Sequence, residues 1–399
     1  MAFSSRRLVT LVASLTVLVA ACSETATPDP DAYRPAATAH AGSPLVFPAE
    51  QWERIDPRDG GFDPAALDAL AAKAEEAGSA CLVVTRDGRL VVDRYWRGTG
   101  PTSAREAFSV TKSVTSLLVG IAQDDGDLTL DDPAARFIPA WRGNPAEAVT
   151  IRNLLSNDSG RHWDLATDYL QMAVQAPDKT AFAVGLPQDH PPGEVWAYNN
   201  SAIQTLSAVL EAATGEDPVE LAERRLFAPI GMKHSRLSRD PAGNALAFMG
   251  LQTTCEDLAR FGLLVLRKGE WDGRRIISED YLELATGAPS TPLNAAYGFL
   301  FWLNHRGRIA SPLIAVTGRD EAPPTGGQTA GQTDSQLVPG APESVVWALG
   351  YQQQIVAIVP SEGIVAVRLG EAPPPGVTFD QGTLTTGLLD ALIDRRGGA

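Results

Sequence analysis

Metal-binding and phosphate-binding patterns are missing from this 399-residue chain. Its five histidines show no i, i+4 or other spacing typical of metal ligands, and they are His40, His162, His190, His234 and His305. There is no glycine-rich phosphate loop and no Gly-x-Ser-x-Gly turn of the kind that exposes a serine nucleophile. We therefore expect neither a metal nor a cofactor.

Positive charge is also scarce, since 33 lysine and arginine residues stand against 48 aspartate and glutamate residues, a formal net charge of −15. Nucleic acids and anionic membrane surfaces attract basic proteins, so we expect neither as an electrostatic partner. Beyond residue 21, no stretch is apolar enough to span a bilayer.

The first 21 residues have the pattern of a secretory signal peptide. Arg6 and Arg7 precede a 14-residue apolar run, Leu8 to Ala21, which is long enough for a signal core but short for a membrane span. The run ends in Val-Ala-Ala-Cys22, which resembles the lipobox of bacterial lipoproteins. That resemblance implies cleavage before Cys22, lipidation of its sulfur and anchoring to the membrane of a bacterial cell envelope. The alternative is a plain secretory signal followed by an unrelated cysteine.

The rest of the chain is predicted to form a tether and one large domain. Residues 22–50 are rich in proline, alanine and threonine and lack periodicity, as expected of a flexible tether. Residues 51–396 form the domain, and with 44% hydrophobic residues in the chain a sizeable core can be buried. Within it, residues 312–342 are loaded with Gly, Pro, Gln and Thr, and we expect a disordered insertion there.

Both ends of the domain carry strand patterns, with mostly helical patterns between them. Residues 81–85 and 89–93 flank Asp87-Gly88, a strong hairpin signal. Thr253 and Glu256 have capping-box spacing at a helix start. Further strands are predicted at residues 297–303, 345–349, 355–359 and 364–369, and helices at 64–77, 203–214, 255–266 and 384–393. This order predicts an α+β fold with two lobes and a cleft along the seam between them.

A candidate nucleophile, Ser109, stands at the start of an amphipathic helix. Apolar residues recur at helical spacing from Val110 to Ile121, so the Ser109 hydroxyl lies near free backbone N–H groups of the first turn. Lys112 lies three residues on, one helical turn away. A lysine kept close to apolar packing is partly desolvated, which lowers its pKa and frees an amine to take the serine proton. The alternative is a polar helix start with a solvated lysine.

A second candidate group is Tyr198-x-Asn200, delivered just before a helix by a proline–glycine turn. A tyrosine close to a lysine can release its phenolic proton more easily and shuttle it to a leaving group. Asn200 can donate to a substrate carbonyl and hold Lys112. The alternative is a packed tyrosine in a polar loop.

Together these motifs resemble those of the class C β-lactamase-related serine hydrolases. That family includes penicillin-binding peptidases, family VIII-type esterases and 6-aminohexanoate-dimer hydrolases. Over roughly residues 60–395 the resemblance extends, in order, to Asn153-Leu154-Leu155-Ser156 with Ser159-Gly160, to Leu226-Phe227 with Pro229-Ile230-Gly231-Met232, and to Asp257-Leu258-Ala259-Arg260-Phe261-Gly262. It implies a β-lactamase/transpeptidase-like fold, in which an antiparallel sheet flanked by N- and C-terminal helices carries a mostly helical inserted lobe. It also implies Ser109, Lys112 and Tyr198 as catalytic residues.

One departure from the family pattern concerns substrate recognition. Where β-lactamases and penicillin-binding proteins carry Lys-Thr-Gly beside the nucleophile, this chain has Ala348-Leu349-Gly350. The groups that would hold a carboxylate are absent, whereas Gly350 still permits close backbone approach, and the Tyr351 N–H can pair with that of Ser109 as an oxyanion hole. We therefore expect hydrolysis of a small ester or linear amide. A β-lactamase or D-Ala-type peptidase is the alternative, and a non-catalytic envelope-binding protein with the same fold is a second.

Two smaller questions stay open at this stage. With Cys22 lipidated, Cys81 and Cys255 form an even pair in an oxidising compartment, and they are expected either as a disulfide or as two buried thiols. His162, beside Trp163, is either a residue of the cleft mouth or a satisfied loop histidine.

Overall fold

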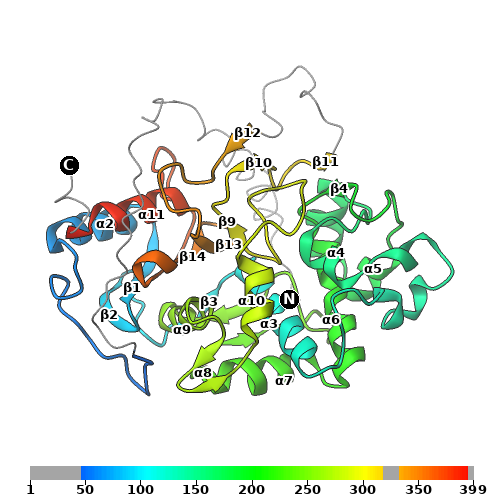
Figure 1. The fold of residues 1–399 in the computed structure, drawn as a ribbon, viewed down its shortest axis with the longest axis horizontal. Helices are drawn as coiled ribbons and strands as arrows, with labels where there is room; N and C mark the ends of the chain where they lie inside the picture. Colours follow the sequence, from blue (N-terminus) through cyan, green and yellow to red (C-terminus); the bar gives the residue numbers. More distant parts are fainter. Residues whose placement is uncertain (1–45, 318–331, 394–399) are drawn as a thin grey trace. The chain divides into compact units, whose positions relative to one another are not determined.

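Hydrophobic runs from both ends of the domain pair into one antiparallel six-stranded sheet (Figure 1). The computed structural model describes residues 46–317 and 332–393, which belong to a single compact unit. In spatial order the strands are β2 (Arg89–Tyr95), β1 (Ser79–Arg86), β15 (Ile364–Gly370), β14 (Gln354–Val359), β13 (Val346–Gly350) and β9 (Trp302–Leu303). The predicted hairpin at Asp87-Gly88 is confirmed, and both turn residues have positive φ, as a tight hairpin between β1 and β2 requires.

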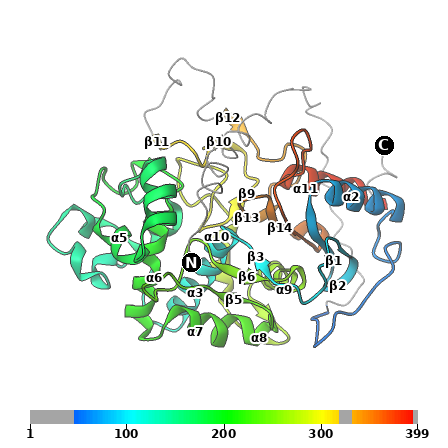
Figure 2. The ribbon, with the colours of Figure 1, turned by 180° about the vertical axis from the view of Figure 1, so that it is seen from behind.

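The central strands are covered on both faces by helices. Strands β1, β14 and β15 are buried along their whole length, which explains their nearly continuous Val/Ile runs. The N- and C-terminal helices α2 (Pro64–Glu76) and α11 (Gln381–Asp390) pack side by side against one face, and α9 (Cys255–Leu266) packs against the other (Figures 1 and 2). Gly262 permits the close approach of α9, because a Cβ there would lie 2.4 Å from the side chain of Val365.

The predicted helical lobe lies between β2 and β9 in the sequence. Its helices are α3 (Val110–Asp124), α4 (Ile151–Ser156), α5 (Lys179–Gly185), α6 (Asn200–Thr214), α7 (Pro218–Ala222), α8 (Ala228–Ile230) and α10 (Glu279–Thr286), with wider helical turns at Ala166–Gln175 and Glu223–Phe227. Two small sheets lie among them. One has three strands, with β6 (Leu251–Thr253) between β3 (Arg105–Glu106) and β5 (Arg236–Leu237), and the other pairs β7 (Glu270–Trp271) with β8 (Arg274–Arg275). Helix α3 contacts both β13 and α6, so it joins the lobe to the sheet.

Two predicted elements differ from the structure. The predicted strand 297–303 is mostly a tight turn, because Leu300 adopts a left-handed φ of 61° and its N–H donates to the carbonyl of Leu155. Only Trp302–Leu303 joins the sheet. The residue that caps α9 is Thr254, which accepts from the N–H of Asp257, whereas Thr253 is the last residue of β6.

The predicted tether is too long at its C-terminal end. The N–H of Val46 donates to the carbonyl of Asp87, and the ring of Phe47 packs 5.4 Å from that of Trp271. Arg260 donates to the carbonyls of residues 48 and 49. Residues 46–50 therefore belong to the folded domain. The signal peptide, Cys22 and the rest of the tether lie outside the described residues.

The predicted disordered insertion, residues 312–342, is also too long. Val316–Thr317 (β11) pairs with Val195–Trp196 (β4), and Gln332–Ser335 (β12) pairs with Gly307–Ile309 (β10). Residues 318–331 lie outside the described part of the chain. Within residues 46–317 and 332–393, every helix is too short or too polar to cross a membrane.

Candidate active site

Ser109 stands directly before α3, at the end of a backbone segment that the surrounding residues hold under strain. Phe108 has φ 47°, a left-handed conformation that is costly for a side chain of its size. The carboxylate of Glu106 accepts from the N–H of Phe108, and the hydroxyl of Thr111 donates to the Phe108 carbonyl at 2.6 Å. The Ser109 hydroxyl makes no capping bond to the helix, so it is left to interact with Lys112. Sequence periodicity located the serine but gave no signal for the role of Glu106.

Lys112 reaches back one turn of α3 to the nucleophile candidate. Its Nζ lies 2.7 Å from Ser109 Oγ and 3.0 Å from the backbone carbonyl of Phe248, and the side chain is buried. Burial lowers the pKa of Lys112 to about 7, and the nearby carboxylate of Asp168 opposes that shift. A substantial fraction of the amine is therefore neutral near pH 7 and able to accept a proton from the serine.

Tyr198 completes the cluster from the segment before α6. Its ring centre lies 4.7 Å from Lys112 Nζ, and it packs among the rings of Tyr297 and Trp302 at 6.0 and 5.7 Å. Burial raises the pKa of Tyr198, although the hydroxyl of Ser109 counteracts that rise in part. The expected easier release of its phenolic proton is therefore wrong in direction: Tyr198 is a neutral phenol beside a partly neutral amine.

Asn200 is near this cluster, but its amide is used differently from the prediction. Its Nδ2 donates to Asp168 at 2.8 Å, whereas the hydrogen-bond partners of Lys112 in the described structure are Ser109 and the Phe248 carbonyl. The prediction that Asn200 holds Lys112 is therefore wrong. Asp168 also accepts from the N–H groups of Asn200 and Ser201 at the start of α6 and from the Ser201 hydroxyl.

Sequence reasoning missed Asp168 altogether. The residue lies in the wide helical turn Ala166–Gln175, more than fifty positions from Lys112, in no recognisable motif. It is buried, which raises its pKa, while the surrounding donors favour the charged form. Only the folded chain brings this carboxylate into electrostatic range of the lysine.

Gly350 and Tyr351 lie at the end of β13, beside the strained segment that precedes Ser109. A Cβ on Gly350 would lie 2.3 Å from the carbonyl oxygen of Ala107, so only glycine allows these two backbones to approach so closely. The ring of Tyr351 meets that of Phe108 edge to face at 5.5 Å. Gly350 and Tyr351 thus lie beside the nucleophile segment, as predicted. The sequence suggested a glycine for the approach of substrate, and the structure shows that the packing against Ala107 requires it as well.

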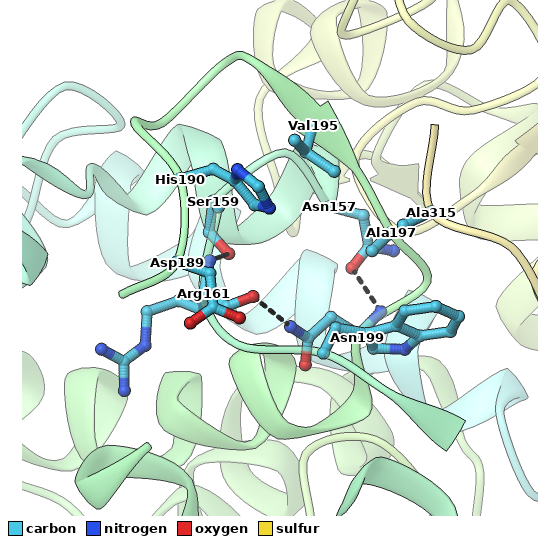
Figure 3. Close-up of a pocket in the computed structure, with 11 residues that line it drawn as sticks. Asn157, Ser159, Arg161, Asp189, His190, Val195, Ala197, Asn199 and Ala315 are labelled. Atoms are coloured by element: carbon cyan, nitrogen blue, oxygen red, sulfur yellow. Dashed lines mark hydrogen bonds between the residues drawn. The ribbon is translucent and has the colours of Figure 1, made fainter. Parts of the chain in front are cut away.

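A small pocket is lined in part by Ala197 and Asn199, the two neighbours of Tyr198 in the sequence (Figure 3). Its lining includes Asn157, Arg161, Trp163 and Asn199, but it does not include Ser109, Lys112 or Tyr198. The indole N–H of Trp163 donates to the carbonyl of Tyr198, so the wall of this pocket is tied to the backbone that carries Tyr198.

His162 is a satisfied loop histidine. Its two ring nitrogens lie 2.7 Å from Asp189 and 3.1 Å from Asp164. In the described part of the chain, no group of three histidine, cysteine or carboxylate side chains is arranged to hold a metal ion.

Cys81 and Cys255 are joined as a disulfide. The bond links β1 to the first residue of α9, so it fixes the helix on the sheet. Of the two alternatives, a disulfide or two separate thiols, the predicted disulfide is confirmed.

The sheet between two layers of helices, with a serine–lysine pair at the start of the connecting helix, is the architecture of the β-lactamase-like serine hydrolases. Comparison with known families agrees with this class, because the Beta-lactamase family model matches residues 67–386. The chain belongs to this family. The predicted resemblance and fold class are therefore confirmed.

Individual relatives show how far the likeness extends. The chain is 25% identical to the 6-aminohexanoate-dimer hydrolase of Paenarthrobacter ureafaciens, over 64% of this chain and 70% of that protein. It is 32% identical to penicillin-binding protein 4 of Amycolatopsis lactamdurans, over 42% of this chain and 47% of that protein, so it spans less than half of that relative. A Bacillus anthracis structure described as a 6-aminohexanoate-dimer hydrolase shares the fold, with a TM-score of 0.65 at 19% identity, over 88% of this chain and 89% of the other.

Proposed function

We propose that this protein hydrolyses a small ester or linear amide through an acyl-enzyme on Ser109. The observation that carries the proposal is the 2.7 Å contact between Ser109 Oγ and a buried lysine with a pKa of about 7. Neutral Lys112 takes the hydroxyl proton as Ser109 attacks the substrate carbonyl. Tyr198, kept protonated by burial, then donates its phenolic proton to the leaving group and recovers one from Lys112.

The developing negative charge on the substrate oxygen is held by backbone N–H groups. The N–H of Ser109 lies at the start of α3, and that of Tyr351 follows the end of β13. The contact between Gly350 and Ala107 supports this pairing, because it holds the end of β13 against the nucleophile segment. Asn200, whose amide is engaged by Asp168, has a supporting role in this scheme.

The substrate is proposed to be neutral next to its reacting carbonyl. Ala348 is buried and Leu349 half-buried in β13, and neither can replace the cation and hydroxyl that recognise a β-lactam or peptide carboxylate. A lost charge-assisted hydrogen bond is worth roughly ten- to a hundredfold in kcat/KM. Relatives named 6-aminohexanoate-dimer hydrolase and D-aminopeptidase support the amide part of this proposal.

The decisive experiment combines a fluorophosphonate probe with substrate profiling. Wild-type protein should be labelled on Ser109 and should turn over p-nitrophenyl acetate or butyrate far faster than nitrocefin. Ser109→Ala should abolish labelling and turnover, and Lys112→Ala should do nearly the same because the two groups act as a unit. Ser116→Ala, about two turns from Ser109 along α3, is the matched control and should retain both.

Two other results would overturn the proposal in different ways. A higher kcat/KM for nitrocefin would make the protein a β-lactamase, and absence of labelling in the folded wild type would make it a binding protein.

We further propose that the mature protein is anchored to a bacterial membrane through lipidated Cys22. The support is the Val-Ala-Ala-Cys run after an apolar segment with two arginines in front. Full-length protein expressed in bacteria should sediment with membranes, and Cys22→Ala should release it into the soluble fraction. Equal release of both proteins would exclude the anchor.

A further inference from the structure

The turn between β13 and β14 adopts a conformation that its own residues disfavour. Gln352 and Gln353 have φ values of 62° and 61°. They lie in a three-residue turn, because Gly350 of β13 pairs with Gln354 of β14. Side chains with a Cβ resist positive φ, and Gly and Asn are the residues that adopt it most readily. Two glutamines therefore need outside support to stay in this turn.

That support comes from a buried arginine on the neighbouring strand. Arg368 lies on β15, opposite Ile355 of β14, and its side chain is fully buried. Among the described residues, none of its hydrogen-bond acceptors is a carboxylate. The guanidinium donates to the backbone carbonyls of Gln352 (2.6 Å), Gln353 (3.0 Å), Ala77 (3.0 Å) and Glu371 (2.6 Å), and to the hydroxyl of Ser79 (2.9 Å).

A second side chain holds the remaining carbonyl of the turn. The amide of Gln354 donates to the carbonyl of Tyr351 at 3.0 Å and to that of Gly370 at 2.8 Å. Its carbonyl oxygen accepts from the N–H of Gly370 at 2.9 Å. Arg368 and Gln354 thus tie the carbonyls of residues 351–353 to β15.

Burial lowers the pKa of Arg368 to about 10, with Arg105 and Arg97 adding to the shift. The guanidinium still keeps its charge at neutral pH, so its hydrogen bonds to the turn are charge-assisted and stronger than those of a neutral donor. Within the described residues, neither Arg105 nor Arg97 makes a hydrogen bond or ion pair with this turn.

We propose that Arg368 is a positioning residue for the oxyanion hole, acting through the turn that it clamps. The inference rests on the proposed function, because Tyr351 supplies the second N–H donor and lies directly before the two strained residues. A donor must stay within a few tenths of an ångström of the developing oxyanion to stabilise it. Loosening the turn would displace the Tyr351 N–H while leaving Ser109 and Lys112 in place.

The test separates positioning from stability by measuring kcat per active site, with sites counted by complete fluorophosphonate titration. Arg368→Met should lower kcat per titrated site on the order of ten- to a hundredfold, with KM changed much less, and should weaken a boronic-acid transition-state analogue in parallel. The acid limb of the pH–rate profile, which reports Lys112, should not move. Arg368→Lys keeps the charge but not the planar set of donors, so it should show the same loss of kcat. It takes the place of Arg368→Met in the test if that variant folds poorly.

A matched control and a rescue complete the design. Arg260 is also buried and also donates to backbone carbonyls, but to those of residues 48–50 and 230, away from Ser109. Arg260→Met should lower the melting temperature and leave kcat per titrated site unchanged. Replacing Gln352 by Asn and Gln353 by Gly builds a turn that needs no clamp, so in the Arg368→Met background it should restore most of kcat.

The inference would be overturned if Arg368→Met and Arg368→Lys both kept the kcat per titrated site of the wild type. It would also be overturned if the Asn-Gly replacement did not restore a kcat lost in Arg368→Met. Failure of the wild type to label or turn over would refute the proposed function itself, which is a separate result.

Discussion

At the scale of single residues, the site depends on the environment of one amine. In the described part of the chain, Lys112 has no carboxylate in hydrogen-bonding contact, and its buried Nζ contacts a hydroxyl and a backbone carbonyl. Desolvation therefore outweighs the distant charge of Asp168, and the pKa falls to about 7 instead of rising. Tyr198 experiences the same burial, which raises its pKa because the phenol is charged only after losing its proton. The same burial thus leaves the amine partly neutral and the phenol protonated, as the proposed mechanism requires.

The pH dependence of the reaction should follow from this arrangement. Wild-type kcat/KM should rise with pH through about 7 as Lys112 loses its proton. Asp168→Asn removes the negative charge that favours protonated Lys112, so the acid limb should move to lower pH. The amide also faces the donors at the start of α6, so we expect a stability loss of roughly 1–3 kcal/mol. The measurement is a pH profile of kcat/KM on folded protein. A limb that moved to higher pH would contradict the electrostatic link between the two residues.

At the scale of secondary structure, the end of β13 brings the segment around Gly350 into contact with the segment before Ser109. Its last residue, Gly350, touches the backbone of Ala107, two residues before the nucleophile. Ala348 and Leu349 differ from the Lys-Thr pair of the family motif in their side chains, but the backbone contact at Gly350 does not depend on those side chains. The family motif can therefore lose its lysine and hydroxyl while keeping the geometry that acyl transfer requires.

Gly350→Ala tests that contact. The added methyl group would have to displace β13 from Ala107, so we expect kcat/KM to fall at least tenfold and stability to drop by about 1–3 kcal/mol. Gly100→Ala is the control, because a Cβ at Gly100 meets nothing within 4 Å and its φ is not left-handed. Assays of kcat/KM and urea unfolding would check both variants. Equal behaviour of the two would show that the close approach is dispensable.

The elements that sequence alone predicted are those whose signal is local. The helix after Ser109 is encoded by apolar residues at one-turn spacing, and the β1–β2 hairpin by Asp87-Gly88 between two Val-rich runs. The serine–lysine pair was visible for the same reason, since both residues lie within one helical turn.

Features that depend on contacts between distant residues escaped prediction. The apolar run at 297–303 is typical of a strand, but the backbone folds at Leu300 because its N–H bonds to Leu155 of another element. Asp168 and Arg368 act through residues far away in the sequence, and no pattern around either one signals a role. The packing of residues 46–50 likewise depends on Arg260, over 200 positions away.

At the scale of the whole molecule, one covalent bond joins the sheet to α9, the helix that covers one of its faces. Cys81 in β1 and Cys255 at the start of α9 are separated by 174 positions, so the disulfide closes a loop that contains α3, the Tyr198 segment and most of the lobe. Closing a long loop restricts the unfolded chain far more than the folded one.

Removing the disulfide should therefore destabilise the protein without altering its chemistry. The double change of Cys81 and Cys255 to alanine should lower the free energy of unfolding by roughly 2–5 kcal/mol, with kcat at 25 °C close to that of wild type. Urea unfolding with and without a reducing agent would measure the effect. The double variant itself should not respond to the reductant, and a response would point to another cause.

The buried lysine has a consequence for the thermodynamics of folding. Its pKa is about 7 in the folded protein against 10.5 in the unfolded chain, so between these values the unfolded chain binds more protons. Stability should therefore rise with pH from about 7 to 10.5, and at neutral pH the buried amine costs on the order of 4 kcal/mol. Lys112→Met, which fills similar space without a charge to desolvate, should be inactive yet unfold at higher urea concentration than wild type at pH 7, with the gap narrowing towards pH 10. Keeping this amine buried therefore lowers the free energy of unfolding, and the proposed catalytic base can be detected from stability alone, without a substrate.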